Sequence, residues 1–522
     1  MSTVLGRSLA ELEEQSRAGA WPILVADLPL HPGGVDPLGL RQLNFDLMDG
    51  VIPGLNNVAS RLRVYVLLAW AWWKAAELGR AQGKSQESAD RLRAFVDRME
   101  VLFAVSHLVN NDFVGLLGRD TLNARVVRPG GFDFTGAGWA KFRKDRALVS
   151  SFMAPVAYGP SAKVGLGLGV LVLSDGGTFV PATEVMPAVL ALESQLEPIL
   201  DEPAFAELDG GFVSLEDMSR YYEFWRAADL TEAEVKAGRE RLYEKKSAAP
   251  RRQSVDLIRH LLETAGRPIT VEQVRRGLGS GLLDGNPATP PDHLIETAQA
   301  WRALMARQLL RLSLESLLTW VLAECAVPSS AEALGARLFN ALGRPNHNKV
   351  SDWLASGTWN GNLTDPVTNP VELMEQLEDE RQADHPELAI DGIKAALAIA
   401  RAGSNRASYQ GQPDRLPLDR LLARTGEMAN LAFAEALEVI VSEWVIGQHV
   451  YWAVGRSGDD TQRLRLMLDE GGWLSFYANP GNARATADRL QTLLRLMSDC
   501  ALCEEIVEGD LRRYAWMAMT GG

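Results

Sequence analysis

The sequence predicts a mainly α-helical protein of several lobes, with a small β insertion and a C-terminal winged-helix-like α+β module. Three observations predict this class. Apolar residues recur at helical spacing through most of the chain. The run Val64–Trp73 contains no charged residue. Glycine-rich stretches with β-type patterns break the helical spacing near 151–182 and again in the last seventy residues.

The first strong element is a helix over about 57–78. Pro53 and Gly54 predict a turn before it, and Asn56 or Asn57 can cap its start. A helix that is apolar on all sides has no face for solvent, so we expect a central buried helix with Trp70 and Trp73 inside. Its uncharged run is too short to cross a bilayer.

Helices continue through the middle of the chain. The longest periodic segment opens at Asp292 and ends near Ala326, with Arg302, Arg307 and Arg311 on another face. Further helices are expected over 330–342, 371–382, 387–401 and 418–446.

Residues 151–182 predict a small sheet or an extended segment, because glycines precede a β-branched run and SDGG is a turn signal. Its GLGLG leads into a strand, whereas a dinucleotide-binding loop follows one, so no cofactor is assigned. Thr231 and Glu234 fit a capping box, and EKKSAAPRRQS at 244–254 reads as an internal linker.

The C-terminal stretch predicts two strands around an Asp-Glu-Gly-Gly turn, a helix over about 482–497, and two strands around a Glu-Gly-Asp turn. A helix followed by a two-stranded ribbon is the tail of a winged-helix module, which serves both DNA binding and protein docking. The acids of this region repel phosphate, which favours protein contact; they are Asp488, Asp499, Glu504, Glu505, Glu508 and Asp510.

These elements suggest five successive segments. They are an N-terminal helical domain at 1–150, the β insertion at 151–185, a helical segment ending in a linker at 186–250, a central helical domain at 251–450 and the winged-helix-like module at 451–522.

Composition excludes several classes of protein. The net charge of −14 argues against coating of nucleic acid by bulk attraction. Three cysteines do not make a disulfide framework, the start of the chain lacks the apolar stretch of a signal peptide, and no window resembles a membrane span. We therefore expect a cytoplasmic protein with no membrane partner.

Charge is unevenly distributed along the chain. The window 239–276 has a net charge of +5, and the window 372–391 has a net charge of −7. In the first window Gly266 and Pro268 separate two helices, which suits a helix-turn-helix but also any helical hairpin. Candidate nucleic-acid contacts are Arg251, Arg252, Arg275 and Arg276. The competing interpretation pairs these arginines with the acidic 372–391 segment.

Residues that usually carry catalysis are scattered. No two of the seven histidines lie within four residues, so no helical His-x-x-x-His metal site exists. Cys500 and Cys503 form a single CxxC pair at a predicted helix end, where buried thiols are expected. There is no phosphate-binding GxxxxGK[ST] loop and no GxSxG elbow. We assign no catalytic residue, cofactor or metal ligand, although dispersed acids could converge in three dimensions.

Three stretches together resemble a set of uncharacterised bacterial proteins. They are DPLGL with PGLNNVASRLRVYVLLAWAW, the WRALMARQLLRLSLESLLTWV helix, and the strand–helix–strand C-terminus. Members of that set are often encoded beside helicases or nucleases in phage-defence islands. The resemblance implies a non-catalytic scaffold or sensor subunit of a multi-protein anti-phage complex. The alternatives are a metal-dependent nuclease with dispersed acids, and a sequence-independent DNA-binding protein.

Overall fold

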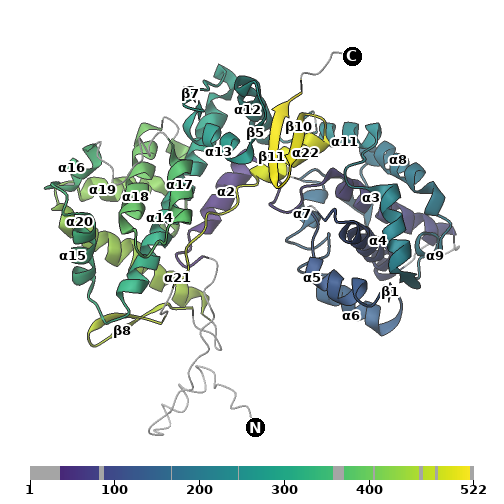
Figure 1. The fold of residues 1–522 in the computed structure, drawn as a ribbon, viewed down its shortest axis with the longest axis horizontal. Coiled ribbons are helices and arrows are strands. Elements are labelled where there is room, and N and C mark those ends of the chain that lie inside the picture. Colours follow the sequence, from purple (N-terminus) through teal and green to yellow (C-terminus); the bar gives the residue numbers. More distant parts are fainter. Residues whose placement is uncertain are drawn as a thin grey trace, which may run out of the picture. The chain divides into compact units, whose positions relative to one another are not determined.

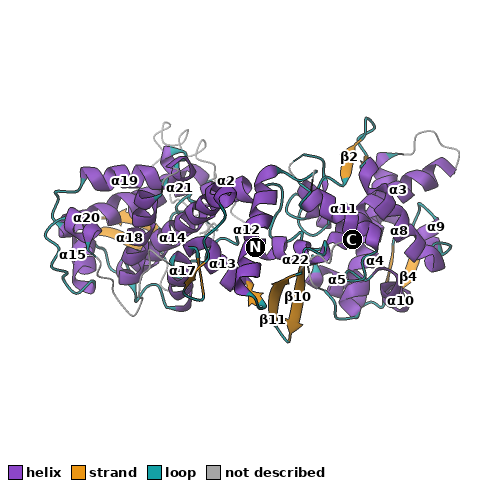
Figure 2. Ribbon diagram, turned by 90° about the horizontal axis from the view of Figure 1, so that it is seen from above, coloured by secondary structure: helices purple, strands orange, loops and turns teal. Residues whose placement is uncertain are grey.

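A computed structural model of the chain describes residues 36–81, 88–113, 115–165, 167–244, 246–356, 369–403, 406–457, 463–476 and 480–517. Of the described residues, 61% are in helices and 9% are in strands, which confirms the mainly helical class. The ribbon in Figure 1 shows short two-stranded ribbons between many helices, and Figure 2 separates the two by colour. The sequence of residues 1–30 predicts a short helix and then an extended segment over the apolar WPILVADLPL, and both lie outside the described residues. Within them, none of the helices has the length and apolar character required to span a bilayer.

The chain folds into two compact units, and each draws on separate stretches of sequence. Unit 1 contains the described residues of Met1–Leu47, Arg276–Thr289 and Ala298–Thr486. Unit 2 contains the described residues of Met48–Arg275, Pro290–Thr297 and Ala487–Gly522. Three helices begin in one unit and end in the other, namely α2 (Arg41–Val51), α13 (Val271–Ser280) and α14 (Ile295–Glu324).

The longer helices of unit 2 are α3 (Leu62–Ala81), α4 (Ala89–Val109), α6 (Gly136–Arg146), α8 (Met186–Leu196), α10 (Leu215–Trp225), α11 (Glu232–Leu242), α12 (Ala249–Ala265) and α22 (Leu490–Asp499). Its short helices are α5 (Arg119–Leu122), η1 (Asn123–Val127), α7 (Tyr158–Ala162), η2 (Thr183–Val185), η3 (Glu197–Ile199), α9 (Pro203–Ala206) and η4 (Asp292–Leu294). Its strands are β1 (Gly131–Asp133), β2 (Leu171–Leu173), β3 (Phe179–Pro181), β4 (Phe212–Ser214), β5 (Ile269–Thr270), β10 (Cys503–Glu508) and β11 (Leu511–Trp516).

Helix α3 is the buried helix expected over 57–78. It packs against α4, α8 and β3. Trp70 is 0% exposed and Trp72 is 2% exposed, whereas Trp73 is half-buried. Helices α4 and α8 and strand β3 therefore enclose the uncharged run within unit 2.

The β insertion is present as a hairpin. Strands β2 and β3 are antiparallel, with Val172 opposite Val180, and the SDGG sequence forms their turn. The capping box at Thr231 and Glu234 is also confirmed at the start of α11. The linker expected over 244–254 is shorter, because α12 already begins at Ala249. Pro250 stands in the first turn of that helix, where its missing N–H has no partner to lose.

A three-stranded antiparallel sheet joins distant parts of unit 2. Its order is β10-β11-β5, with Tyr514 opposite Ile269 and Arg513 opposite Thr270. Strand β5 lies between α12 and α13, while β10 and β11 follow α22 at the end of the described chain. Both ribbons expected in the C-terminal stretch are present, but α22 begins at Leu490, later than expected.

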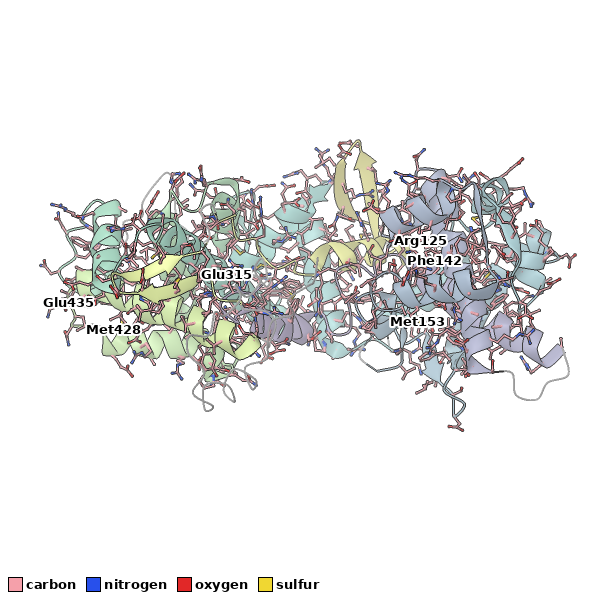
Figure 3. All side chains as sticks on the ribbon, turned by 90° about the horizontal axis from the view of Figure 1, so that it is seen from below. Arg125, Phe142, Met153, Glu315, Met428 and Glu435 are labelled. Atoms are coloured by element: carbon pink, nitrogen blue, oxygen red, sulfur yellow. The ribbon has the colours of Figure 1, made fainter. Side chains whose placement is uncertain are left out.

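Unit 1 is built around α14. Figure 3 labels Glu315 on this helix. The remaining helices of the unit are α15 (Ala331–Ala341), α16 (Val350–Ala355), α17 (Pro370–Asp379), α18 (Pro386–Ala402), η5 (Arg406–Tyr409), η6 (Pro413–Arg415), α19 (Leu418–Glu427), α20 (Phe433–Val439), η7 (Ile440–Gly447) and α21 (Gln448–Arg456). Its strands are β6 (Leu282–Leu283), β7 (Asn286–Pro287), β8 (Leu466–Asp469) and β9 (Gly472–Ser475).

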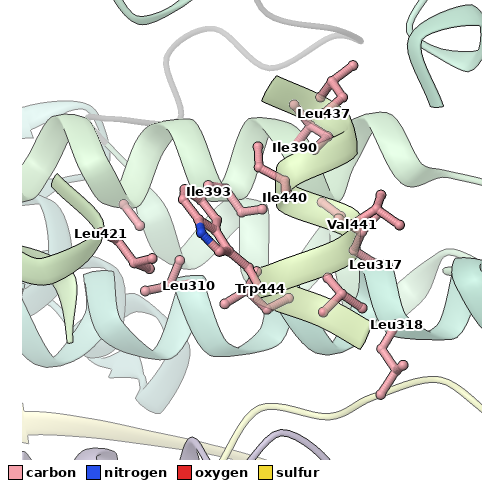
Figure 4. Close-up of a cluster of buried hydrophobic side chains, with 14 of the residues drawn as sticks. Leu310, Leu317, Leu318, Ile390, Ile393, Leu421, Leu437, Ile440, Val441 and Trp444 are labelled. Atoms are coloured by element: carbon pink, nitrogen blue, oxygen red, sulfur yellow. The ribbon is translucent and has the colours of Figure 1, made fainter. Parts of the chain in front are cut away.

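The core of unit 1 lies where α14, α18, α19, α20 and η7 meet. Figure 4 shows Leu310 and Leu317 of α14 facing Ile393 of α18 and Trp444 of η7. Leu310, Leu317 and Ile393 are fully buried, and Trp444 is 2% exposed. Dense apolar packing of this kind holds a helical unit together without a sheet.

The single helix expected over 418–446 is wrong. The chain breaks between α19 and α20, and the break has a tertiary cause. Backbone N–H groups of Val350 and Ser351 donate to the carbonyls of Leu431 and Ala429, at 3.2 and 3.1 Å. Those carbonyls bond to a distant segment instead of to the next turn of a helix.

Candidate functional site

Arg251 lies in the first turn of α12 with no exposed surface. Its Nη1 donates to the carbonyl of Pro53 at 2.7 Å, and its Nη2 donates to the carbonyl of Arg241 at 2.9 Å. Its Nε donates to Ser247 Oγ at 3.1 Å. Burial lowers the pKa of this guanidinium to about 10, so it remains charged at neutral pH. Arg251 ties together backbone segments of unit 2 and has no surface with which to reach a phosphate.

The other three candidate arginines have different surroundings. Arg275 Nε pairs with Asp488 Oδ2 at 2.6 Å in unit 2. Arg276 pairs with Glu375 in unit 1, which is the pairing with the acidic 372–391 segment that the competing interpretation expects. Arg252 is half-buried, and no ion pair links it to a described residue. The four guanidinium groups therefore do not share one exposed surface.

Helix α22 is almost completely covered. Of its residues only Gln491 is exposed. The helix packs against α11 and β10. Its leucines fill the interior of unit 2, because Leu490, Leu493, Leu494 and Leu496 are all 0% exposed.

Most acids of the C-terminal stretch are engaged in ion pairs within unit 2 and do not form a repulsive surface. The pairs are Asp488 with Arg275 at 2.6 Å, Asp499 with Arg61 at 3.4 Å, Glu505 with Arg512 at 3.0 Å, and Glu508 with Arg513 at 2.6 Å. Glu504 and Asp510 are exposed.

The two cysteines of the CxxC pair are free and buried. Burial raises the pKa of both the Cys500 and the Cys503 thiol above the usual range. Both sulfurs therefore keep their protons at neutral pH, which suits the expectation of apolar core residues.

Among the described residues, one histidine in each unit is buried and uses both ring nitrogens. His107 Nδ1 donates to the carbonyl of Phe103 at 2.8 Å, and its Nε2 accepts from the Ala227 N–H at 3.0 Å. In unit 1, His449 Nδ1 donates to the carbonyl of Pro37 at 3.0 Å, and its Nε2 accepts from the Arg465 N–H at 2.9 Å. Burial lowers the pKa of each imidazole to about 4. Both rings are neutral parts of the scaffold.

A buried carboxyl lies between α4 and the chain after α6. Glu100 Oε2 accepts from Ser151 Oγ at 2.9 Å and from the Phe152 N–H at 2.8 Å. Burial raises the pKa of Glu100 to about 7, and the neighbouring Asp97 adds to the increase while Arg146 opposes it. This carboxyl can therefore hold a proton near neutral pH.

Two arginines expected on a separate face of α14 are buried instead. Arg311 pairs with Glu315 at 2.6 Å, and Arg307 Nη2 donates to the carbonyl of Arg415 at 2.8 Å. Among the described residues, Nε and Nη1 of Arg307 have no hydrogen-bond partner. Burial, followed by repulsion from Arg311, lowers the pKa of Arg307 to about 9. The helix lacks a solvent face here because α14 is enclosed within unit 1.

Sequence reasoning missed a group of exposed cations on α5, η1 and α6. The window 119–146 contains seven Lys/Arg and three acids, a net charge of +4. The same charge count that selected 239–276 would have found it. Elsewhere, no group of three or more His, Cys, Asp or Glu side chains placed to hold a metal occurs within the described ranges.

No protein-family model, curated protein or solved structure matches the chain.

Proposed function

We propose that this chain is a non-catalytic scaffold or sensor subunit that binds other proteins within a bacterial anti-phage defence complex. The defence setting rests on the resemblance of the three sequence stretches. The binding role is supported by the way unit 2 uses α22 and the β10–β11 ribbon.

We infer that α12, β5 and the first half of α13 form one winged-helix-like module with α22, β10 and β11. In such modules a short strand after the first helix pairs with the outer strand of the ribbon. The pairing of β5 with β11 has this form. In addition, the ion pair between Arg275 and Asp488 joins α13 to the chain just before α22. Most of unit 1 is then an insertion between the second and third helices of the module.

The observation that carries the protein-binding role is the burial of α22. A helix-turn-helix reads DNA by placing its second helix in the major groove, which requires a solvent-facing side. Helix α22 occupies that position in the module, yet only Gln491 is exposed. Helix α22 is therefore part of the core of unit 2, and the β10–β11 ribbon is the part of the module that a partner can reach.

The ribbon has features suited to a protein partner. The sheet order leaves β10 at an edge, where an extended segment could add a strand. Near the turn, Val507 is 52% exposed and Leu511 is 41% exposed. Exposed aliphatic side chains beside a free edge contribute to association with another protein, and they contribute little to contact with phosphates.

A pull-down with mass spectrometry tests this proposal in cells that express the neighbouring genes. We expect defined partners with the wild type and their loss with the double variant Val507→Ser/Leu511→Ser. The matched control is Met467→Ser/Leu468→Ser on the β8–β9 ribbon of unit 1, where Leu468 is 68% exposed. Equal partner loss with both variants would remove the β10–β11 ribbon as the contact. Absence of any reproducible partner would contradict the scaffold role.

A second test addresses the non-catalytic part of the proposal. We expect purified protein neither to hydrolyse ATP nor to cut DNA in the presence of Mg²⁺ or Mn²⁺. Activity that survives repurification and is abolished by replacing one acid would overturn the proposal in favour of a nuclease or ATPase.

A further inference from the structure

A basic surface of unit 2 is formed by two neighbouring segments. The first segment is α5 with η1, and the second is α6. Arg125 Nη1 and Asp145 Oδ2 are 3.0 Å apart, and a Cβ on Gly118 would lie 3.0 Å from Ser150 Cβ. Residues 118–125 therefore run antiparallel alongside residues 145–150. Figure 1 shows α5 and α6 side by side in the same part of the unit.

Apolar packing fixes this pair of segments. Leu122 and Val126 face inward from the first segment, and Phe142 faces inward from α6. The guanidinium of Arg125 lies 5.8 Å from the centre of the Phe142 ring, and Figure 3 labels both side chains. The polar residues on the outer side are therefore held on a defined scaffold.

The outer side is strongly cationic. Arg119, Arg128, Lys141 and Lys144 are exposed, and the Arg125 side chain is 46% exposed. Asp145 pairs with Arg125, but no ion pair links Arg128, Lys141 or Lys144 to any residue that the structure describes. These three charges are available, although the whole chain has a net charge of −14.

The cations form two short rows. Arg125 and Arg128 are three residues apart at η1, and Lys141 and Lys144 are three residues apart on α6. On the α-helix α6, side chains at this spacing lie on the same side, about 5–6 Å apart, and Arg125 and Arg128 are both exposed on the π-helical turn η1 and at its end. The Arg125–Asp145 pair holds the two rows next to each other. Arg128, Lys141 and Lys144, which have no ion-pair partner among the described residues, suit the repeating charges of a phosphate backbone.

We propose that this surface binds the phosphate backbone of nucleic acid without reading its sequence. Leu148 and Val149, which follow α6, are exposed apolar residues. They favour a second candidate ligand, namely an acidic and partly apolar segment of another protein. They lie after the two rows in sequence and not between them, and the exposed Asp145 beside the rows is paired with Arg125. Lysines and arginines that reach phosphates position a strand and give no base preference.

The test uses the variant Arg128→Glu/Lys141→Glu/Lys144→Glu and fluorescence anisotropy with labelled oligothymidine and a duplex of mixed sequence. Three phosphate contacts predict that raising salt from about 50 to 200 mM weakens wild-type binding about 20-fold for the single strand and about 40-fold for the duplex. The variant should bind at least about tenfold more weakly at low salt and lose most of this salt dependence.

A matched triple variant, Lys236→Glu/Arg252→Glu/Arg267→Glu, changes the net charge by the same amount elsewhere in unit 2 and should bind as the wild type does. Circular dichroism and the melting temperature confirm the fold, and glutamine replacements at 128, 141 and 144 substitute for the glutamates if the first variant unfolds. Three results would overturn the proposal. They are no salt-sensitive binding by the wild type, equal weakening by the control triple, and tighter binding of polyglutamate than of an oligonucleotide of equal charge.

Discussion

The carboxylate of Asp499 accepts a hydrogen bond from the backbone N–H of Leu62 at 2.8 Å, across 437 positions of sequence. Leu62 is the first residue of α3, and Asp499 is the last residue of α22. The N–H groups of a first helical turn have no partner within the helix, and a carboxylate there also meets the positive end of the helix dipole. The last residue of α22 thus caps the central helix of unit 2.

We therefore expect Asp499→Ala to lower the free energy of unfolding by about 2 kcal/mol, because the cap and the contact with Arg61 are both lost. Asp499→Asn keeps an acceptor oxygen and should cost about 1 kcal/mol or less. Urea unfolding of both variants at neutral pH measures the difference. Equal losses would show that the charge, and not the cap, carries the stability.

Arg251 gives a second stability prediction. Replacing it by Ala removes the donor to the buried carbonyl of Pro53 and to the partly buried carbonyl of Arg241, and an unsatisfied buried group costs about 1–3 kcal/mol. We expect Arg251→Ala to destabilise by about 3–5 kcal/mol, and Arg251→Lys to recover little because an ammonium cannot reach the same set of acceptors. Thermal unfolding compares both with Arg252→Ala, which should change stability by less than about 0.5 kcal/mol. A small loss in Arg251→Ala would show that the guanidinium is dispensable.

The adjacent pair Arg251 and Arg252 shows where sequence reasoning stops. A charge count finds a basic stretch, but it does not reveal that one guanidinium is enclosed and that the next is half-buried. That difference depends on which side of α12 packs onto the rest of unit 2. A charge count finds the basic stretch over 119–146, but its charges gather on one surface only when the two segments fold against each other.

The elements predicted correctly are those whose signal is local. The uncharged run of α3, the capping box at Thr231 and the turn-flanked ribbons each contain their own evidence. The break after α19 depends on hydrogen bonds from Val350 and Ser351, and the pairing of β5 with β11 joins segments far apart in sequence. No periodicity within either segment signals such contacts.

The two neutral histidines predict loss of stability in acid. The folded pKa of His107 and of His449 is about 4, below the ordinary value of 6.5, so the unfolded chain takes up protons first as pH falls. Their stabilising contribution is complete above pH 6.5 and is lost as pH falls toward 4. At about pH 5 each should cost on the order of 2 kcal/mol.

Urea unfolding between pH 7 and about 4.5 measures this loss. Because protonation of Nε2 removes its acceptor for the Ala227 or Arg465 N–H, His107→Gln and His449→Gln should each be less stable at neutral pH but flatter in their pH dependence. If the slope of the wild type persists in both variants, other groups cause the acid sensitivity.

Glu100 predicts a pH dependence of the opposite sign. Its folded pKa is about 7, above the ordinary value of 4.5, so the folded protein holds a proton that the unfolded chain has already released. Stability associated with this carboxyl is therefore present below pH 4.5 and is lost as pH rises toward 7. Glu100→Gln remains neutral throughout, and its Oε1 can still accept from the Phe152 N–H. Relative to the wild type, this variant should gain about 3 kcal/mol between pH 4.5 and about 8.

The comparison of variant with wild type isolates Glu100, because the histidines titrate in both proteins and cancel in the difference. Exposed Glu216→Gln is the matched control and should show no gain across the same range. Urea unfolding at several pH values provides the two curves. A constant difference between Glu100→Gln and the wild type would mean that the carboxyl is ionised in the fold, held so by Arg146 at the end of α6. A difference that grows with pH would show that Glu100 is protonated in the fold. Its effect on the pH dependence of stability would then have the opposite sign to that of His107 and His449.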